Sequence, residues 1–575
     1  MNRPVGQMHG VPSRWRFALV LVGLGGMALV LAARAAELQL MDRAFLVDEA
    51  NDRHLRVAEV PAHRGTITDR AGEPLAISSP VQSVWAHPGR LLEHAGRLPE
   101  LAARLDTTAE ALRERLTARR DREFVYLERH MTPRQAKAVE ALDVPGLALQ
   151  REYRRFYPAG EVAGHVIGFT NIDDRGQEGM ERAYDDWLRG QPGKKKVLQD
   201  QLGRRIEDVE QLKPAQPGRD LALSLDRRLQ YRAYRALKQA VERRGASSGS
   251  VVVLDARSGE VLAMANQPSF NPNERSELDP AAYRNRAVTD VFEPGSTLKP
   301  FTVAAALGPG GYRPGQSIDT APGTLRVQGN RIRDIRNYGK LTLRDVLVKS
   351  SNVGAAKIAL SLDRGTLWQT LGQVGFGERT ASAFPGEAGG HLDRRAAERP
   401  IERATLAFGY GVSVTALQLA RAYAAIANDG VRPTVSLLHQ DAPGRDLAGP
   451  RVLKAQTARE LRTMLDGVVS PRGTGSRAAI PGYNVAGKTG TVQQSAQAGY
   501  DEDRYTALFA GMVPVEEPRF VGVVVINDPS DDAYYGGEVA APVFKRVMRS
   551  ALRLNNVAPQ TTGSRQDLVM IREAR

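Results

Sequence analysis

Three short motifs contain residue types that can perform nucleophilic chemistry. In chain order they are Ser296–Lys299 (STLK), Ser350–Asn352 (SSN) and Lys488–Thr491 (KTGT). A serine hydroxyl becomes a good nucleophile only when a neighbouring base takes its proton, and the motifs offer two lysines for that purpose. The pattern therefore predicts Ser296 as a nucleophile and Lys299 as its base.

The local sequence supports this pairing. Pro294-Gly295 predicts a turn, after which Ser296 opens a helix that continues to Leu307. Residues three apart face each other on a helix, so Lys299 can reach the Ser296 hydroxyl. A lysine accepts a proton only when neutral, and moving its pKa from about 10.4 to about 7 takes about 4–5 kcal/mol of differential interaction. Burial and a second cation, Lys488, can supply that shift.

The other two motifs are expected at the same cleft. Ser350 and Asn352 follow a helix expected over 341–349, from which they can project toward the nucleophile. The segment containing Lys488, Thr489, Gly490 and Thr491 is predicted to form a strand edge. A free strand edge can pair with an extended peptide substrate.

Two further motif matches are rejected on their context. Residues 482–489 fit the nucleotide-binding pattern GxxxxGK[ST], but Gly490, Thr491 and Val492 favour a strand where a P-loop needs a helix. Residues 245–249 fit the hydrolase pattern GxSxG. There the serine precedes a strand, whereas a nucleophile elbow follows one.

The sequence gives little support for metal chemistry. Cysteine is absent, and after residue 215 the only histidines are His391 and His439, each in a loop-like stretch. No metal-ligand spacing such as HExxH occurs. We therefore expect no metal and no organic cofactor, and a serine nucleophile whose base is not histidine.

Length and composition bound the class of protein. The chain has 575 residues, of which 42% are hydrophobic and 25% charged. It contains 79 Lys and Arg residues and 65 Asp and Glu residues, so its net charge is 79 − 65 = +14. These values exclude a mostly disordered, collagen-like or polytopic membrane protein and predict two or more folded units. The arginines are spread along the chain without a nucleic-acid motif. This favours a basic surface facing an anionic envelope over nucleic-acid binding.

The N-terminus predicts a membrane anchor. Residues 17–36 are apolar except for Arg34, and twenty helical residues span about 30 Å, the thickness of a bilayer core. Arg3, Arg14 and Arg16 precede them without an acidic residue, which keeps the tail (residues 1–16) in the cytoplasm and exports the rest. The alternative is a signal peptide cleaved near residues 33–35. The length of the apolar run favours an uncleaved anchor.

The exported body divides into two predicted regions. Residues 37–215 are expected to form an extended, non-catalytic pedestal with a helical stretch from Leu98 to Leu142, and a linker follows at 213–218. Residues 216–555 are expected to form an α+β domain with an antiparallel sheet flanked by helices, because strand patterns at both ends enclose helical ones. The expected elements are a helix capped by Asp226, a hairpin over 250–264, strands near 505–515 and 520–526, and a helix opened by Pro542. Residues 556–575 are expected to form a flexible tail.

Seven sequence blocks, covering about residues 15 to 555, resemble those of the penicillin-binding-protein and serine β-lactamase superfamily. Within it the chain is most similar to class B penicillin-binding proteins, and among them to the cell-division members. The blocks are RGTITDRAGEPLA, EGMERAYDDWLRG, FEPGSTLKPFTVAAAL, KSSNVGAAKIAL, FGYGVSVTALQLARAYAAIANDG, VAGKTGTVQ and YYGGEVAAPVFKRVM.

The resemblance implies a serine D,D-transpeptidase that cross-links peptidoglycan stem peptides ending in D-Ala-D-Ala at the division septum. Ser296 would form the acyl-enzyme and Lys299 would take its proton. The implied assisting and substrate-binding residues are Ser350, Asn352, Lys488, Thr489, Gly490 and Thr491. The implied oxyanion hole consists of the backbone N–H groups of Ser296 and Thr491. The implied partners are β-lactams, the FtsW glycan polymerase and other divisome proteins, with the catalytic domain on the periplasmic side of the bacterial inner membrane.

The sequence also departs from related enzymes. Ser350-Ser351-Asn352 stands where class A β-lactamases have Ser-Asp-Asn, and no counterpart of their deacylating glutamate is identified, so fast β-lactam hydrolysis is not expected. The first region shows no glycosyltransferase module. The alternatives are an elongation-specific class B transpeptidase, a β-lactam-sensing receptor and a non-catalytic divisome scaffold.

Overall fold

The computed structural model describes residues 14–37, 55–199, 205–274, 279–439, 449–496, 499–530 and 534–560. The chain forms two compact units. The first unit comprises residues 1–62, 80–153 and 191–216, and the second comprises 63–79, 154–190 and 217–575. Two segments of the predicted pedestal region, 63–79 and 154–190, thus pack within the second unit.

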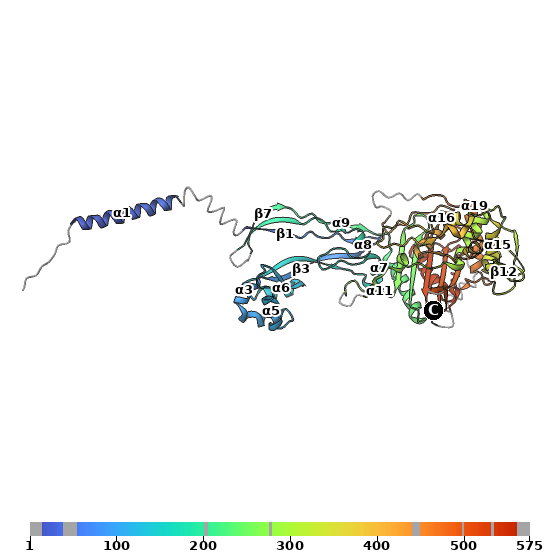
Figure 1. Ribbon diagram of the computed structural model, residues 1–575, viewed down its shortest axis with the longest axis horizontal. Helices are drawn as coiled ribbons and strands as arrows, with labels where there is room; N and C mark the ends of the chain where they lie inside the picture. Colours follow the sequence, from blue (N-terminus) through green and yellow to red (C-terminus); the bar gives the residue numbers. More distant parts are fainter. Residues whose placement is uncertain are drawn as a thin grey trace, which may run out of the picture. The chain divides into compact units, whose positions relative to one another are not determined.

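The N-terminal helix α1 (Arg14–Ala36) is the one helix in the described part of the chain that is long and apolar enough to cross a membrane (Figure 1). Its 23 residues span about 35 Å. None of its side chains is buried against the protein. The helix includes the whole apolar run predicted from the sequence and begins three residues before it, at the basic residues Arg14 and Arg16.

The first unit contains a three-stranded antiparallel sheet in the order β1-β6-β7. A separate core of leucines and valines holds four short helices against the end of β3 and against β4. The predicted helical stretch from Leu98 to Leu142 is wrong in one place, because β4 interrupts it. Its Val125, Leu127 and Met131 are buried, which favours a strand paired with β3. The elements are β1 (Leu55–Val60), β3 (Pro74–Ala86, shared with the second unit), α3 (Pro88–Glu93), η2 (Ala95–Arg97), α4 (Leu98–Arg104), α5 (Ala109–Thr117), β4 (Val125–Met131), α6 (Pro133–Glu140), β5 (Leu147–Phe156, also shared), β6 (Gly193–Gln199) and β7 (Arg205–Lys213).

The second unit is built on a five-stranded antiparallel sheet with the order β10-β9-β19-β18-β17. Strands from the two ends of its sequence lie side by side, and Figure 1 shows them in green and orange-red. The α+β class and the predicted hairpin are confirmed. The strands are β9 (Ser248–Asp255), β10 (Val261–Gln267), β17 (Ala486–Ala496), β18 (Gly499–Val513) and β19 (Phe520–Asn527).

Helices cover both faces of this sheet. On one face lie α10 (Arg227–Arg243), which Asp226 caps as predicted, and α20 (Gly536–Leu554). On the other face, α18 (Ala416–Ala427) lies buried between the sheet and α13 (Lys299–Leu307), which it contacts through Tyr423. The larger core of the unit therefore lies directly beneath the helix that follows Ser296.

The remaining elements of the second unit surround this framework. They are β2 (Ile67–Thr68), η3 (Gly160–Val162), α7 (Gly164–Ile167), α8 (Gly179–Ala183), α9 (Asp185–Leu188), β8 (Leu221–Ala222), α11 (Pro280–Tyr283), α12 (Arg286–Thr289), η4 (Gly295–Leu298), β11 (Ser317–Asp319), β12 (Thr324–Val327), β13 (Asn330–Arg333), β14 (Lys340–Thr342), α14 (Leu343–Val348), α15 (Asn352–Ser361), α16 (Thr366–Gln373), β15 (His391–Leu392), η5 (Arg394–Ala397), α17 (Pro400–Leu406), β16 (Val412–Ser413), α19 (Ala455–Val469) and η6 (Ser476–Ala478).

The prediction that Pro542 opens a helix is wrong, because α20 begins six residues earlier at Gly536. A Cβ atom at Gly536 would lie 2.2 Å from the carbonyl oxygen of Gly490 and 2.3 Å from that of Leu508. The first turn of α20 is thus seated directly on the sheet. This close packing fixes the helix start, and Pro542 then removes one backbone donor inside the helix.

Charged side chains from two distant segments of the sequence meet in the interior of the second unit. Arg64 donates from Nε to Glu181 Oε2 at 2.8 Å and from Nη1 to Asp185 Oδ1 at 2.7 Å. Arg155 donates from Nε to the other oxygen of Glu181 at 2.6 Å. The side chains of Arg64, Arg155 and Glu181 are fully buried, so the carboxylate between the two guanidinium groups holds segments 63–79 and 154–190 together.

Candidate active site

A cleft of about 500 Å³ in the second unit brings the three motifs together. Its lining includes Ser296 from the first motif, Ser350 and Asn352 from the second, and Thr489 and Thr491 from the third. The rest of the lining comprises Arg333, Asp334, Ile335, Tyr338, Lys349, Thr474, Ser476, Arg477, Tyr535, Gly537 and Glu538. Gly490 is not among the lining residues, and Lys299 and Lys488 lie fully buried.

Ser296 lies in the 3₁₀ turn η4, whereas the sequence predicted the first turn of an α-helix; α13 starts at Lys299. Gly295 precedes it with φ +51°, and a Cβ atom there would lie 2.3 Å from Val492 Cγ2. Glycine is therefore the residue that lets the turn approach β17 so closely. Thr297 fixes the turn with its hydroxyl, which donates to the Pro294 carbonyl at 2.6 Å.

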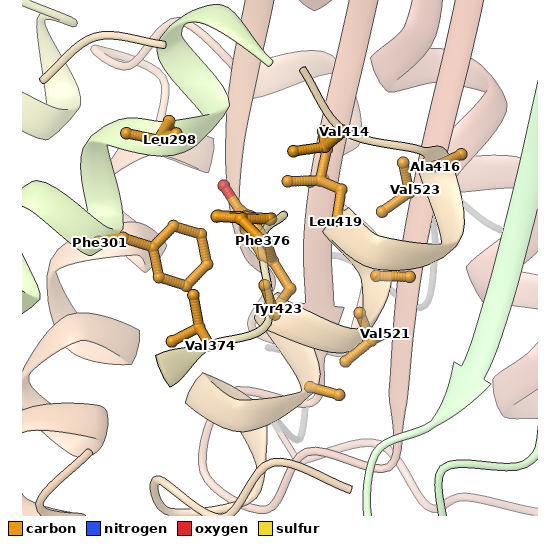
Figure 2. Packing of buried hydrophobic residues seen from close by; sticks show 14 of the residues in the cluster. Leu298, Phe301, Val374, Phe376, Val414, Ala416, Leu419, Tyr423, Val521 and Val523 are labelled. Atoms are coloured by element: carbon orange, nitrogen blue, oxygen red, sulfur yellow. The ribbon is translucent and has the colours of Figure 1, made fainter. Parts of the chain in front are cut away.

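Aromatic packing anchors this turn from below. Tyr423 of α18 donates its hydroxyl to the Thr297 carbonyl at 2.8 Å. Figure 2 shows Tyr423, Phe301 and Phe376 in the core beneath the turn. The ring of Phe301 lies edge-on to those of Phe376 and Tyr423, at 5.4 and 5.6 Å between centroids. Edge-to-face pairs of this kind each add about 0.5–1.5 kcal/mol beyond area burial, so they stabilise the packing beneath the Ser296 turn.

The ammonium group of Lys299 is directed at the middle motif. Its Nζ donates to the Ser350 carbonyl at 2.6 Å, to Ser350 Oγ at 3.1 Å and to Asn352 Oδ1 at 2.7 Å. These three acceptors use the three donors of a charged lysine. Ser296 Oγ is not among the hydrogen-bond partners of Lys299, so the direct contact expected from the i, i+3 spacing is absent in this state of the described site.

Ser350 connects the two lysines. Its Oγ accepts from Lys299 and, at 3.0 Å, from Lys488 Nζ, which also donates to the Thr489 carbonyl at 3.1 Å. The backbone of Ser350 has φ +57°, a left-handed conformation that a residue with a Cβ rarely adopts. This conformation turns both the carbonyl and the hydroxyl of Ser350 toward Lys299.

Burial of the two lysines changes their acidity. Burial lowers the pKa of Lys488 from 10.5 to about 7. Burial and then the charge of Lys488 lower the pKa of Lys299 well below 10.5, while the Asp334 carboxylate opposes that change. These are the two causes expected from the sequence. Both changes favour the neutral form of lysine, which is the form that can accept a proton.

Asp334 is a site residue that no motif in the sequence indicates. Its carboxylate accepts hydrogen bonds from the Ser351 hydroxyl at 2.5 Å, from the Asn352 N–H at 2.6 Å and from the Val353 N–H at 3.0 Å. It thereby caps the N-terminus of α15 and holds the SSN segment in place. The cap comes from another loop, so no local capping pattern around residue 352 reveals it.

Strand β17 forms one wall of the cleft. It is an edge strand that pairs with β18 among the described strands, as predicted from the third motif. Thr489 Oγ1 lies 2.9 Å from Thr474 Oγ1, and Thr491 Oγ1 accepts from the Gly536 N–H at 3.0 Å. The Thr491 hydroxyl acts as the acceptor in its contact, so its proton can be donated to a substrate carboxylate. Gly490 packs tightly between Thr297 and β18.

The outer cleft also contains aromatic and charged groups that the three motifs do not include. Tyr535 stacks on Tyr534 at 4.6 Å between centroids, and Tyr534 stacks on Tyr505 at 4.4 Å. Arg477 pairs with Glu538 at 3.2 Å. The described residues include no group of three His, Asp or Glu side chains that could hold a metal ion.

The rejected motifs have other structural roles. Lys488 of the P-loop-like segment lies within strand β17, where a P-loop would begin a helix. Ser247 of the GxSxG match immediately precedes β9 and donates its hydroxyl to Asp528 Oδ2 at 2.6 Å.

Two segments of the chain match the models of known protein families. Residues 249–549 match the penicillin binding protein transpeptidase domain, and residues 59–223 match the penicillin-binding protein dimerisation domain. The chain is 44% identical to the peptidoglycan D,D-transpeptidase FtsI of Escherichia coli K12, over 97% of this chain and 95% of that protein. It is 41% identical to the probable peptidoglycan D,D-transpeptidase PbpC of Pseudomonas aeruginosa, over 95% and 96% of the two chains.

Solved structures agree with these matches. Penicillin-binding protein 3 of Mycobacterium tuberculosis, complexed with aztreonam, superposes with a TM-score of 0.68 at 28% identity, covering 88% of this chain and 98% of that one. The transpeptidase domain of Burkholderia pseudomallei penicillin-binding protein 3 is 42% identical, with a TM-score of 0.54, and covers 59% of this chain and 98% of that domain. The chain belongs to the penicillin-binding proteins of class B. Within that class it resembles the FtsI proteins, and its catalytic domain is a transpeptidase domain.

Proposed function

We propose that this protein is a septal peptidoglycan D,D-transpeptidase in which Ser296 is the nucleophile. The substrate is a stem peptide ending in D-Ala-D-Ala, and β-lactams acylate the same serine. The single observation that carries the proposal is the arrangement of Ser296 at a cleft above two buried lysines, which share the hydroxyl of Ser350.

The acylation step follows from this arrangement. The oxygen of Ser296 attacks the carbonyl carbon of the penultimate D-alanine while Lys299, in its neutral form, takes the proton. The bond from that carbon to the nitrogen of the terminal D-alanine breaks, and the leaving nitrogen receives a proton relayed through Ser350, which bridges Lys299 and Lys488. The backbone N–H groups of Ser296 and Thr491 stabilise the oxyanion, a contribution of about 2.7–4 kcal/mol for each donor.

The second step forms the cross-link. The amine of a neighbouring stem attacks the ester carbonyl, an amide bond forms, and the ester oxygen regains a proton as Ser296 is released. Asn352 and Lys488 position the peptide, Gly490 lets the strand pack closely, and Thr489 and Thr491 bind its terminal carboxylate. No step needs a metal or an organic cofactor.

The proposal also includes the position of the protein in the membrane and the roles of its two regions. Helix α1 anchors the chain in the bacterial inner membrane, with residues 1–16 in the cytoplasm and the catalytic domain in the periplasm, because Arg3, Arg14 and Arg16 precede the apolar run of residues 17–36. Residues 37–215 act as a non-catalytic pedestal that binds the FtsW glycan polymerase and other divisome proteins, and residues 216–555 as the transpeptidase domain.

The test uses the full chain in detergent with stem pentapeptide-bearing strands. Wild type should release D-alanine in equal amount to the cross-linked dimer formed, whereas Ser296→Ala should produce neither. D-alanine release that persists in Ser296→Ala would refute the proposal. For the septal role, a fluorescent fusion should gather at mid-cell, and a side-wall pattern would instead indicate the elongation-specific enzyme.

A further inference from the structure

Helices α10 and α20 are unusually basic. Together they contain ten Lys or Arg residues and two acidic residues, Glu242 and Glu538. In α10, Arg235 and Arg243 follow Arg232 by three and eleven residues, and in α20 the spacings from Arg546 to Arg549 to Arg553 are three and four. These spacings place the three arginines of each helix on one side of it. We call these six the arginine face: Arg232, Arg235, Arg243, Arg546, Arg549 and Arg553.

The arginines of α10 and those of α20 belong to one surface. The helices pack side by side, and Arg546 Nη1 donates to Gln239 Oε1 of α10 at 2.6 Å. Partial burial and the nearby charges of Arg243 and Arg549 lower the pKa of Arg546. None of the six arginines forms an ion pair with a described acidic residue. Glu242 is the one acid on the exposed side of α10. The folded protein thus maintains repulsion among like charges, which an anionic partner would relieve.

The arginine face leads away from the catalytic cleft. Gly537 and Glu538, in the first turn of α20, line the cleft. Arg546 and Arg553 are eight and fifteen residues beyond Glu538, which corresponds to about 12 Å and about 23 Å along the helix. A polymer whose reacting group occupies the cleft can therefore continue over α20.

We propose that the arginine face binds the carboxylates of stem peptides along a peptidoglycan strand while one stem occupies the cleft. This inference rests on the proposed function. Each stem ends in a carboxylate, and guanidinium groups bind carboxylates through paired hydrogen bonds. Binding along the strand raises the effective concentration of neighbouring stems at the cleft.

The experiment separates this surface from the cleft. The full chain in detergent is first acylated with a penicillin, and intact mass is recorded. Binding to soluble uncross-linked peptidoglycan strands is then measured at about 50 mM and about 500 mM salt, since screening is strong at the higher value. The test variant is Arg546→Gln/Arg549→Gln/Arg553→Gln. The control is Arg326→Gln/Arg364→Gln/Arg394→Gln, which removes the same charge from exposed sites elsewhere in the second unit.

We expect acylated wild type and the control to bind the strands alike. The test variant should bind about tenfold more weakly at low salt, with the difference shrinking at high salt. Strands whose carboxylates have been amidated should bind wild type as weakly as unmodified strands bind the test variant. If the triple variant takes up no penicillin, the single exposed change Arg549→Gln replaces it and should weaken binding by a smaller factor.

Three results would overturn the inference: no strand binding by acylated wild type, equal binding by test and control variants, or undiminished binding of amidated strands. Failure of the proposed function gives a different result, because Ser296 would then show no penicillin adduct. Strand binding can be measured in either case.

Discussion

Replacing Lys488 by methionine should stabilise the protein at neutral pH while slowing acylation by penicillin. The pKa of the buried amine falls from 10.5 to about 7 in the folded protein. At about 1.4 kcal/mol for each pKa unit, keeping this group costs about 4 kcal/mol of stability at pH 7. Methionine removes that cost. It also leaves Ser350 Oγ and the Thr489 carbonyl without the lysine donor, a loss of about 1–3 kcal/mol.

The pH dependence of the free energy of unfolding separates the contribution of the Lys488 amine from that of its hydrogen bonds. Because its folded pKa lies below its unfolded pKa, the unfolded chain binds more protons between pH 7 and 10.5, and stability rises with pH across that range. Between pH 7 and 9, wild type should gain about 2 kcal/mol more than Lys488→Met. Removing Lys488 also takes a positive charge away from Lys299, which reduces the cost of burying Lys299 and acts in the same direction.

The assay is urea unfolding of the full chain at pH 7, 8 and 9, followed by tryptophan fluorescence and circular dichroism. Lys340→Met, at an exposed position in β14, serves as the control and should follow wild type at each pH. A constant difference between wild type and Lys488→Met from pH 7 to 9 would refute the assignment of a lowered pKa to Lys488.

Three further substitutions test the supports of the site. Asp334→Asn should slow acylation of Ser296 and lower stability by about 1.5–3 kcal/mol, because the α15 N-terminus loses its charged acceptor; acylation kinetics unchanged from wild type would argue against its positioning role. Tyr423→Phe should cost about 1–3 kcal/mol by leaving the Thr297 carbonyl unpaired, measured as a lower thermal midpoint, and an unchanged midpoint would contradict this. Glu181→Gln should cost about 3–5 kcal/mol in urea unfolding, because the buried Arg155 loses the carboxylate it pairs with and Arg64 keeps only Asp185; a loss below about 1 kcal/mol would show that Glu181 does not hold the two segments together.

The sequence predicts elements whose signal is local. The helix capped by Asp226, the hairpin of β9 and β10, and the strand containing Lys488 each depend on residues a few positions apart, and the structure has them. The order and spacing of the three motifs likewise predict one cleft. The residues of those motifs line it or lie buried beneath it, apart from Gly490, which packs against its wall.

The sequence does not predict features that depend on contacts between distant segments. Asp334 caps a helix from another loop, and Arg64 meets Glu181 across 117 positions, so neither contact has a local pattern. Pro542 is a strong local signal for a helix start, yet packing of Gly536 on the sheet overrides it. The hydrogen bonds of Lys299 to the middle motif, and not to Ser296, depend on the left-handed backbone of Ser350, which sequence spacing does not reveal.

The central claim, that Ser296 is the nucleophile, is tested most directly by intact-mass analysis after incubation with a penicillin. We predict that wild type gains the mass of one penicillin, that peptide mapping locates it on Ser296, and that Ser296→Ala gains none. An adduct of the same mass on Ser296→Ala, or a folded wild type that takes up no penicillin, would contradict the account.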